Sequence, residues 1–214
     1  PTDVIGMAKK EPEKEFVFLG IGFETTAPTT SALLLQGDLP ENLSIMSFHR
    51  TVPPALKAIA SAGKIKLDGL IEPGHVSMII GEDPYRFLSA DYGLPQAIAG
   101  FEPLDLIMAC LEIAKQKKEN RAELTNLYGR VVRPEGNPEA LSAMRETFVA
   151  TDIQWRGFPV IPGSGLAVSP KFAEKDAYRI YEDELEEVRS MDIPEPAGCR
   201  CGEVLRGLID PKEC

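Results

Sequence analysis

The stretch EFVFLGIG, residues 15–22, decides the fold class of this chain. It contains an apolar run rich in Phe, Val and Ile, which is the pattern of a β-strand buried on both faces. The following stretch TTSALLLQG, residues 29–37, has helical character and ends on a glycine, a usual helix stop. Because strands buried on both faces belong to parallel sheets covered by helices, these two stretches predict an α/β fold.

The alternation of strand and helix continues to about residue 160. Three further stretches read as strands: LSIMSFH (43–49), KLDGLI (66–71) and PQAIAG (95–100). Helices are expected between and after them over residues 53–63, 83–93 and 103–120. We therefore predict a parallel sheet flanked by helices, followed by a smaller irregular C-terminal segment that bears cysteines.

The stretch PLDLIMACLEIAKQKKEN, residues 103–120, is the clearest helix. Its period of 3.6 residues places Leu104, Ile107, Cys110 and Leu111 on one face, and its last turn is basic. We expect this apolar face to be the packed one, and Cys110 to be a core residue.

The remainder of the chain is less regular. A turn rich in Pro and Gly precedes an amphipathic helix within residues 130–150, and residues 152–169 read as one or two strands broken by prolines. Residues 171–190 form a charged stretch typical of a surface helix, and residues 191–198 have the composition of a linker.

Composition excludes two classes of protein. The net charge of −10 disfavours nucleic acid as a partner, because phosphate binding needs a basic surface. No stretch approaches the roughly 18 apolar residues of a membrane span, and no export signal begins the chain. We expect a cytoplasmic protein.

Polar side chains follow each predicted strand. Glu24, Thr25 and Thr26 come after the first strand, His49 ends the second, EPGHVS with Glu72 and His75 ends the third, and Glu102 follows the fourth. Ligands of open α/β sheets bind at the carboxyl ends of the strands. If the ends share one rim, the sequence predicts a polar cleft that binds a metal complex or moves protons near neutral pH.

Ordinary explanations exist for each of these residues alone. Carboxylates and hydroxyls before a helix cap its free N–H groups, which accounts for Glu24, Thr25 or Thr26 singly. His75 follows Pro-Gly and is explained by a turn, and His49 by a structural role. No glycine-rich phosphate loop or nucleophile elbow is present.

Three of the four cysteines lie in the last stretch, GCRCGEVLRGLIDPKEC, residues 198–214. Thiolates bind iron and zinc well, and the C-x-C pair of Cys199 and Cys201 supplies two ligands at once, with Cys214 as a third. The spacing matches no common zinc finger or ferredoxin, and an iron–sulfur cubane takes four cysteines. An exposed tail with incidental thiols is the alternative.

Six motifs resemble the HypD family of [NiFe]-hydrogenase maturation factors. They are GFETTAP (22–28), PGHVSMIIG (73–81), GFEPLD (100–105), YGRVVRPEGNP (128–138), WRGFPVIPGSGL (155–166) and CRCGEVLRGLIDPKEC (199–214). The resemblance implies that residues 1–168 are the second α/β domain of that fold. It also implies that residues 169–214 hold the charged helix, the linker and the start of the iron–sulfur region.

The resemblance further implies a function: a scaffold with a redox role, rather than a conventional turnover enzyme. It would help to assemble the Fe(CN)2CO group with a HypC-like chaperone and a HypE-like cyanide donor. Glu24, Thr25, Thr26, His75 and Glu102 would line the cleft, orienting ligands and moving protons. Cys199, Cys201 and Cys214 match cysteines around the family's [4Fe–4S] cluster. This chain lacks the other cysteines, so the resemblance implies an incomplete cluster here.

Two other classes remain open from the residues alone. One is a small-molecule-binding α/β enzyme, transferase-like, that uses the same rim without a metal. The other is an interaction domain stapled by one zinc ion at the cysteine tail. Metal analysis separates the three hypotheses: iron with sulfide, no metal, or zinc.

Overall fold

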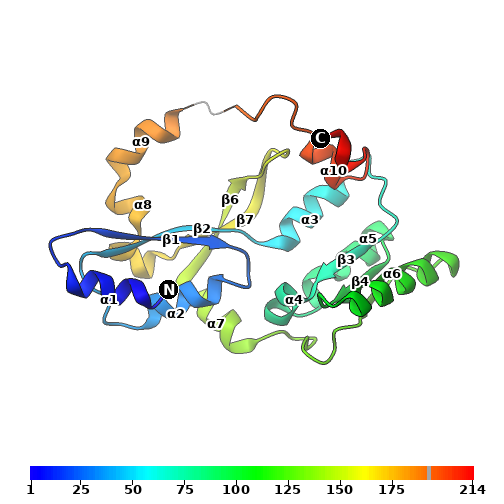
Figure 1. The fold of residues 1–214 in the computed structure, drawn as a ribbon, viewed down its shortest axis with the longest axis horizontal. Helices are drawn as coiled ribbons and strands as arrows, with labels where there is room; N and C mark the ends of the chain where they lie inside the picture. Colours follow the sequence, from blue (N-terminus) through cyan, green and yellow to red (C-terminus); the bar gives the residue numbers. More distant parts are fainter. Residues whose placement is uncertain (192–193) are drawn as a thin grey trace.

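The structure of the chain, a computed structural model, describes residues 1–191 and 194–214. Its strands form two bodies, which we call the first and second lobes (Figure 1). The first lobe contains β1, β2 and the hairpin β6–β7 with α1, α2, α7 and α8, and the second contains β3, β4 and β5 with α4, α5 and α6. Helix α3 (Val52–Ser61) leads from the first lobe to the second.

The first lobe is built on two parallel strands. Strand β1 (Phe16–Gly22) pairs along its whole length with β2 (Leu43–His49). One face of this pair packs on three helices, α1 (Asp3–Lys10), α2 (Ala27–Leu35) and α7 (Pro138–Thr147). The core between them contains Ile5, Leu33, Leu34, Leu43, Ile45, Met144 and Phe148.

Beside β2 lies an antiparallel hairpin, β6 (Phe148–Gln154) with β7 (Val160–Val168). The hairpin is tied to β2 by the hydroxyl of Ser47, which donates to the carbonyl of Leu166 at 2.5 Å. The prediction of one or two strands in this region is confirmed, and β7 continues through Pro162 as one of them.

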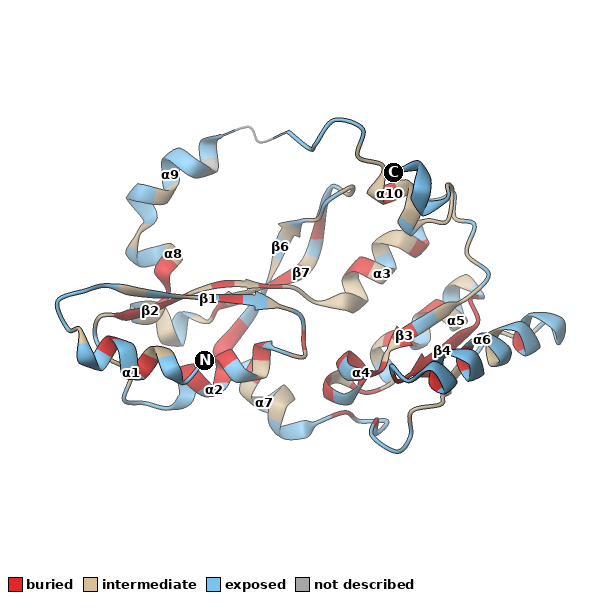
Figure 2. Ribbon diagram, viewed as in Figure 1, coloured by how far each residue is buried: buried red, intermediate tan, exposed pale blue. Residues whose placement is uncertain are grey.

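The second lobe is a three-stranded parallel sheet in the order β3 (Leu70–Pro73), β4 (Gln96–Ala99), β5 (Leu124–Asn126). All four residues of β4 are buried (Figure 2). Its helices are α4 (Gly74–Ile80), α5 (Arg86–Tyr92), which follows the short 3-10 turn η1 (Asp83–Tyr85), and α6 (Pro103–Lys118).

The α/β class with parallel sheets packed against helices is confirmed. The four predicted strands, however, divide between two sheets, so their carboxyl ends do not form the edge of a single sheet. The sequence pattern also missed β5, which has only three residues, and helices α1 and α4.

Helix α6 packs with the face opposite to the predicted one. Its buried residues are Asp105, Ala109 and Gln116, whereas Leu104 is 67% exposed. The two polar side chains are drawn inward by partners: Arg130 donates two hydrogen bonds to Asp105, at 3.0 and 2.7 Å, and Gln116 donates to the carbonyl of Gln96. The prediction that Cys110 is a core residue is wrong, because it is exposed on this helix.

The C-terminal part runs along the outside of the molecule before it returns to the lobes (Figure 1). After the 3-10 segment η2 (Pro170–Lys175) come α8 (Ala177–Ile180) and the mostly exposed, acidic α9 (Glu182–Ser190). The predicted linker falls partly on residues 192–193, outside the described residues. The chain ends in α10 (Cys201–Leu205) and η3 (Pro211–Glu213) beside α3.

Candidate functional site

Glu24 lies in the loop between β1 and α2, and its carboxyl is buried with 2% of the residue exposed. Its Oε1 accepts a hydrogen bond of 2.8 Å from the backbone N–H of Val52, the first residue of α3. Glu24 therefore caps α3 and not the helix that follows it in sequence. Thr25 is half-buried, and the exposed Thr26 donates from its hydroxyl to the carbonyl of Phe23 at 3.1 Å.

Burial governs the protonation of Glu24. Loss of water raises the pKa of its carboxyl to about 7, against the opposing effect of hydrogen bonds from its own N–H and that of Val52. Its second oxygen, Oε2, has no hydrogen-bond partner in the described part of the chain. A carboxyl with a pKa near neutrality can both hold and release a proton.

Glu72, on β3, is a second carboxyl of the same kind. It is 1% exposed, burial raises its pKa to about 8, and its Oε1 finds no partner among the described residues. The sequence places Glu72 at a strand end but gives no sign that its side chain turns inward. The sequence pattern marks Glu72 as one of the polar residues at the strand ends, but it assigns Glu72 no role in the predicted cleft.

Tyr85, in η1, lies within electrostatic reach of both carboxyls. Its ring is fully buried, and burial raises the pKa of its phenol, with further increases from the charges of Glu72 and Glu24 and an opposite effect of the Ser77 hydroxyl. Glu24 comes from the first lobe and Glu72 from the second. We call these three residues, Glu24, Glu72 and Tyr85, the carboxyl cluster.

His75 and Glu102 lie in a different setting, on the surface of the second lobe. His75 is exposed on the first turn of α4, with its ring centroid 4.6 Å from that of Phe101. Glu102 is exposed directly before α6. The structure thus brings His75 close to the loop that carries Glu102, and Glu24 close to Tyr85.

The other histidine, His49, has a structural role. It is 1% exposed, its Nε2 lies 2.8 Å from the hydroxyl of Thr30 on α2, and burial lowers its pKa. This contact ties β2 to α2, and burial favours the neutral form of the ring.

The three tail cysteines converge. The sulfur atoms of Cys199, Cys201 and Cys214 all lie within 4.8 Å of one another, and those of Cys199 and Cys201 are 3.4 Å apart. The backbone N–H of Arg200 donates to the sulfur of Cys214 at 3.4 Å. We call this group the cysteine triad.

The thiols of the triad differ in acidity. The N–H of Cys201 donates a hydrogen bond that lowers the pKa of Cys199, helped by the Cys201 thiol and by the charge of Arg156. The pKa of Cys201 is raised to about 11, chiefly because its proton bridges to Cys199. The three thiols therefore interact with one another, as their short separations require.

Three thiols are a donor set that fits a soft metal. Thiolates around one tetrahedral zinc ion, with Zn–S of about 2.3 Å, lie roughly 3.8 Å apart. The separations of 3.4 Å and up to 4.8 Å in the structure bracket that value. The residues also suit iron, which takes the same ligand type.

The triad is fixed to the lobes by close backbone contacts. The N–H of Lys66 donates to the carbonyl of Arg206 at 2.8 Å, and Gly202 of α10 lies directly on Gly157 in the turn of the β6–β7 hairpin. A cavity of about 320 Å³ opens beside Cys199, lined in part by Arg200, Arg206 and Glu203.

Gly202→Ala should release the tail from the hairpin. A Cβ on Gly202 would stand 2.3 Å from the carbonyl oxygen of Gly157, so one of the two backbones must move, at a cost of about 1–3 kcal/mol. Trp155, the single tryptophan, lies in an apolar cavity with Leu205 and reports the change through its fluorescence. We expect a red-shifted emission.

The matched control for that experiment is Gly129→Ala, because a Cβ there meets no atom within 4 Å. Its emission should stay as in the parent chain. Unchanged emission in Gly202→Ala would show that the tail does not depend on this contact.

These features define the class: a mixed α/β protein whose C-terminal end gathers three thiols able to bind a metal. The sequence signature of HypD, described as the hydrogenase formation hypA family, matches residues 1–214. The chain therefore belongs to the HypD family. No helix in the described ranges, 1–191 and 194–214, is long and apolar enough to cross a membrane.

Three relatives illustrate the similarity. The chain is 43% identical over 220 residues to a protein of Methanocaldococcus jannaschii named for hydrogenase expression and formation. It is 38% identical over 218 residues to the hydrogenase maturation factor HypD of Rhodobacter capsulatus, and 37% over 217 residues to that of Escherichia coli. Each match covers 100% of this chain but only 57–58% of the relative.

Proposed function

We propose that this chain is part of a hydrogenase maturation factor whose cysteine triad holds an iron–sulfur cluster. The convergence of three thiols in a member of this family supports the proposal most directly. Cys199, Cys201 and Cys214 would be three ligands of a [4Fe–4S] cluster, and the fourth would come from sequence that the longer relatives carry in addition. The cluster, when bound, would supply electrons for assembly of the Fe(CN)2CO group.

The carboxyl cluster would serve that assembly as a proton store. Glu24 and Glu72 are buried, and their pKa values of about 7 and about 8 leave Glu72 mostly protonated and Glu24 about half protonated near neutral pH. Neutral carboxyls donate hydrogen bonds, so they can orient small anionic or diatomic ligands without repelling them. His75 and Glu102, which are exposed, would act where the HypC-like chaperone and the HypE-like cyanide donor bind.

A single zinc ion is the second candidate for the triad. The short sulfur–sulfur separations favour it, since they match three corners of one tetrahedral site. Under this alternative the tail would be a staple that holds the hairpin and the Lys66 segment together.

Cys201→Ser distinguishes these roles when it is made at the aligned position of the full-length Escherichia coli relative. We expect the purified variant to lose more than half of its iron and sulfide, and hydrogenase activity in the cell to fall at least tenfold, because the cluster loses a ligand. Metal and acid-labile sulfide are measured on the purified protein.

The control is made on the 214-residue chain, where Cys110 is a cysteine outside the triad. Cys110→Ser should leave the metal affinity of the chain unchanged, whereas Cys201→Ser should lower it. Zinc without sulfide in the full-length protein would favour the staple, and no metal in any form would refute both roles.

A further inference from the structure

Strand β1 is open on one face, although its sequence is that of a fully buried strand. Val17, Leu19 and Ile21 are 38%, 51% and 67% exposed. They point away from α1 and α2, and their register partners on β2 are Ser44, Met46 and Phe48.

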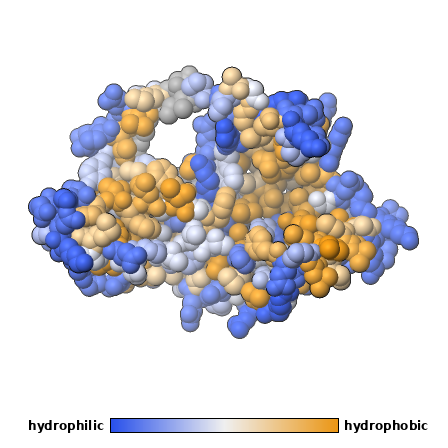
Figure 3. All heavy atoms as spheres, viewed as in Figure 1, coloured by the Kyte–Doolittle hydropathy of each residue, from blue (hydrophilic) through white to orange (hydrophobic). Residues whose placement is uncertain are grey.

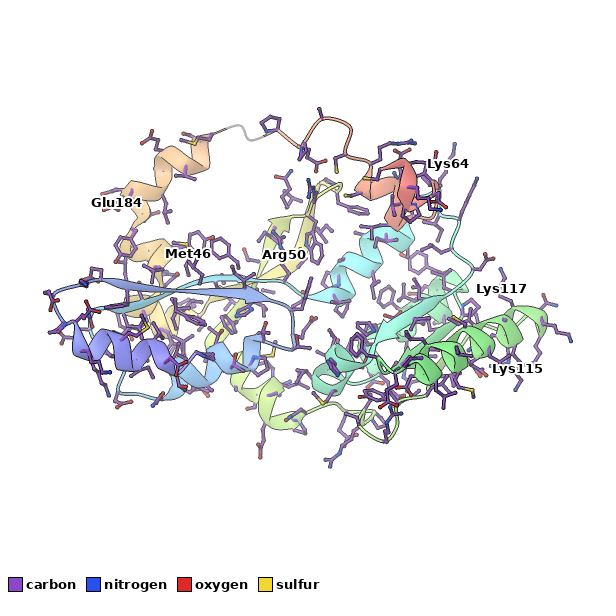
Figure 4. All side chains as sticks on the ribbon, in the orientation of Figure 1. Met46, Arg50, Lys64, Lys115, Lys117 and Glu184 are labelled. Atoms are coloured by element: carbon purple, nitrogen blue, oxygen red, sulfur yellow. The ribbon has the colours of Figure 1, made fainter. Side chains whose placement is uncertain are left out.

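On β2 the same face is covered. Phe48 packs edge-on against Tyr178 of α8, with ring centroids 5.9 Å apart. Met46 stands on the side of β2 that faces α8 and α9 (Figure 4). Apolar side chains gather on this part of the surface (Figure 3). The cover ends at β2, so the exposed strip follows β1 alone.

The hydrogen-bonding edge of β1 is open as well. Within the described residues β1 pairs only with β2, in a sheet of two parallel strands. Natural edge strands are protected by charged residues or prolines, and residues 16–22 contain neither. Parallel strands are normally covered on both faces, and two strands alone are marginally stable.

We propose that β1 is an inner strand of a larger parallel sheet, completed by the additional sequence that the longer relatives carry. A segment of that sequence would add a parallel strand at the β1 edge, and its crossover helix would cover Val17, Leu19 and Ile21. More than two fifths of each relative lies outside the match, which is enough for several such strand–helix units.

A second copy of this chain fits the surface less well. Two β1 strands related by a twofold axis run antiparallel. They would pair the free backbone N–H and C=O groups of the β1 edge but leave the apolar face over β1 uncovered. A βαβ unit closes the edge and the face together. The inference rests on the fold and not on the metal or the maturation role.

Amide hydrogen exchange tests the proposal on two proteins, this 214-residue chain and the full-length relative of Escherichia coli. In the chain, peptides from residues 16–22 should exchange at least tenfold faster than peptides from residues 43–49. In the full-length relative, the peptides aligned with these two strands should be protected equally.

Leu19→Glu, made at the aligned position of the relative, should restore fast exchange in the strand aligned with β1, because it buries a charge under the crossover helix. Met7→Glu is the matched control, since Met7 is 52% exposed on α1, away from this strip. Equally fast exchange of β1 in both proteins would overturn the proposal. The proposal would also be overturned if β1 of the 214-residue chain became more protected as the chain dimerises. A second copy of the chain would then be the occupant of this surface.

Discussion

Raising the pH from about 5 to about 9 should lower the free energy of unfolding of this chain by several kcal/mol, and Glu72→Gln should remove roughly half of that loss or slightly more. The cause is the carboxyl cluster. Glu72 and Glu24 are almost fully buried, and both have raised pKa values in the folded protein, about 8 and about 7, against 4.5 for the free side chain.

The sign follows from proton linkage. Between pH 4.5 and about 8 the folded state binds more protons than the unfolded state, so stability is full below pH 4.5 and falls as the pH rises through 7 and 8. Each unit of pKa difference corresponds to about 1.4 kcal/mol, which sets an upper limit of roughly 3–5 kcal/mol for either group. Glutamine cannot ionise, so Glu72→Gln should be more stable than the parent chain at alkaline pH.

Urea unfolding followed by circular dichroism at several pH values measures the effect. The matched control is Glu13→Gln, because Glu13 is an exposed glutamate. It should follow the parent curve. A parent stability that stays level or rises between about pH 5 and 9 would show that Glu72 and Glu24 are solvated and charged, and the proton-store role would be lost with it.

The fold class was predictable because residues 15–22 contain an apolar run followed by a helical stretch, the pattern typical of an α/β fold. The stretch 15–22 predicts a strand buried on both faces, and the structure buries only one of them. That difference is itself informative, because it locates the surface that the chain leaves open.

The division into two sheets was not predictable from local pattern. Nothing in the residues of β2 and β3 states whether they will be neighbours, since that depends on where α3 directs the chain. The packed face of α6 was mispredicted for a related reason. Asp105 and Gln116 are buried because Arg130 and Gln96 provide partners, and those partners are distant in sequence.

The candidate site was predictable in part. Glu24 was identified from its place between a strand and a helix. The cysteine triad was identified because three of the four cysteines lie close together in the last stretch of the sequence. Glu72 was noted only as a polar residue at a strand end and Tyr85 was not noted, since the role of each comes from its burial in the folded chain.

Gly81→Ala should lower the free energy of unfolding by about 3 kcal/mol or more, a larger loss than that of Gly202→Ala. Gly81 ends α4 with φ 79° and ψ −159°, a conformation that is essentially confined to glycine. A Cβ there would stand 2.2 Å from the carbonyl oxygen of Pro134 and 2.8 Å from the nitrogen of Gly136. Backbone strain and steric overlap therefore add.

Gly37→Ala is the control for a positive φ without steric overlap, because Gly37 has φ 78° but a Cβ there meets no atom within 4 Å. It should cost only the strain of about 1–2 kcal/mol. The contact at Gly81 has a wider consequence, because Glu82 bonds to Pro134 and Asn137 to Ile79 where the chain returns from the second lobe to α7. If that crossing holds Glu72 against the first lobe, Gly81→Ala should also weaken the alkaline loss of stability as the carboxyl gains water. A Gly81→Ala variant no less stable than Gly37→Ala in urea would show that the crossing is loose.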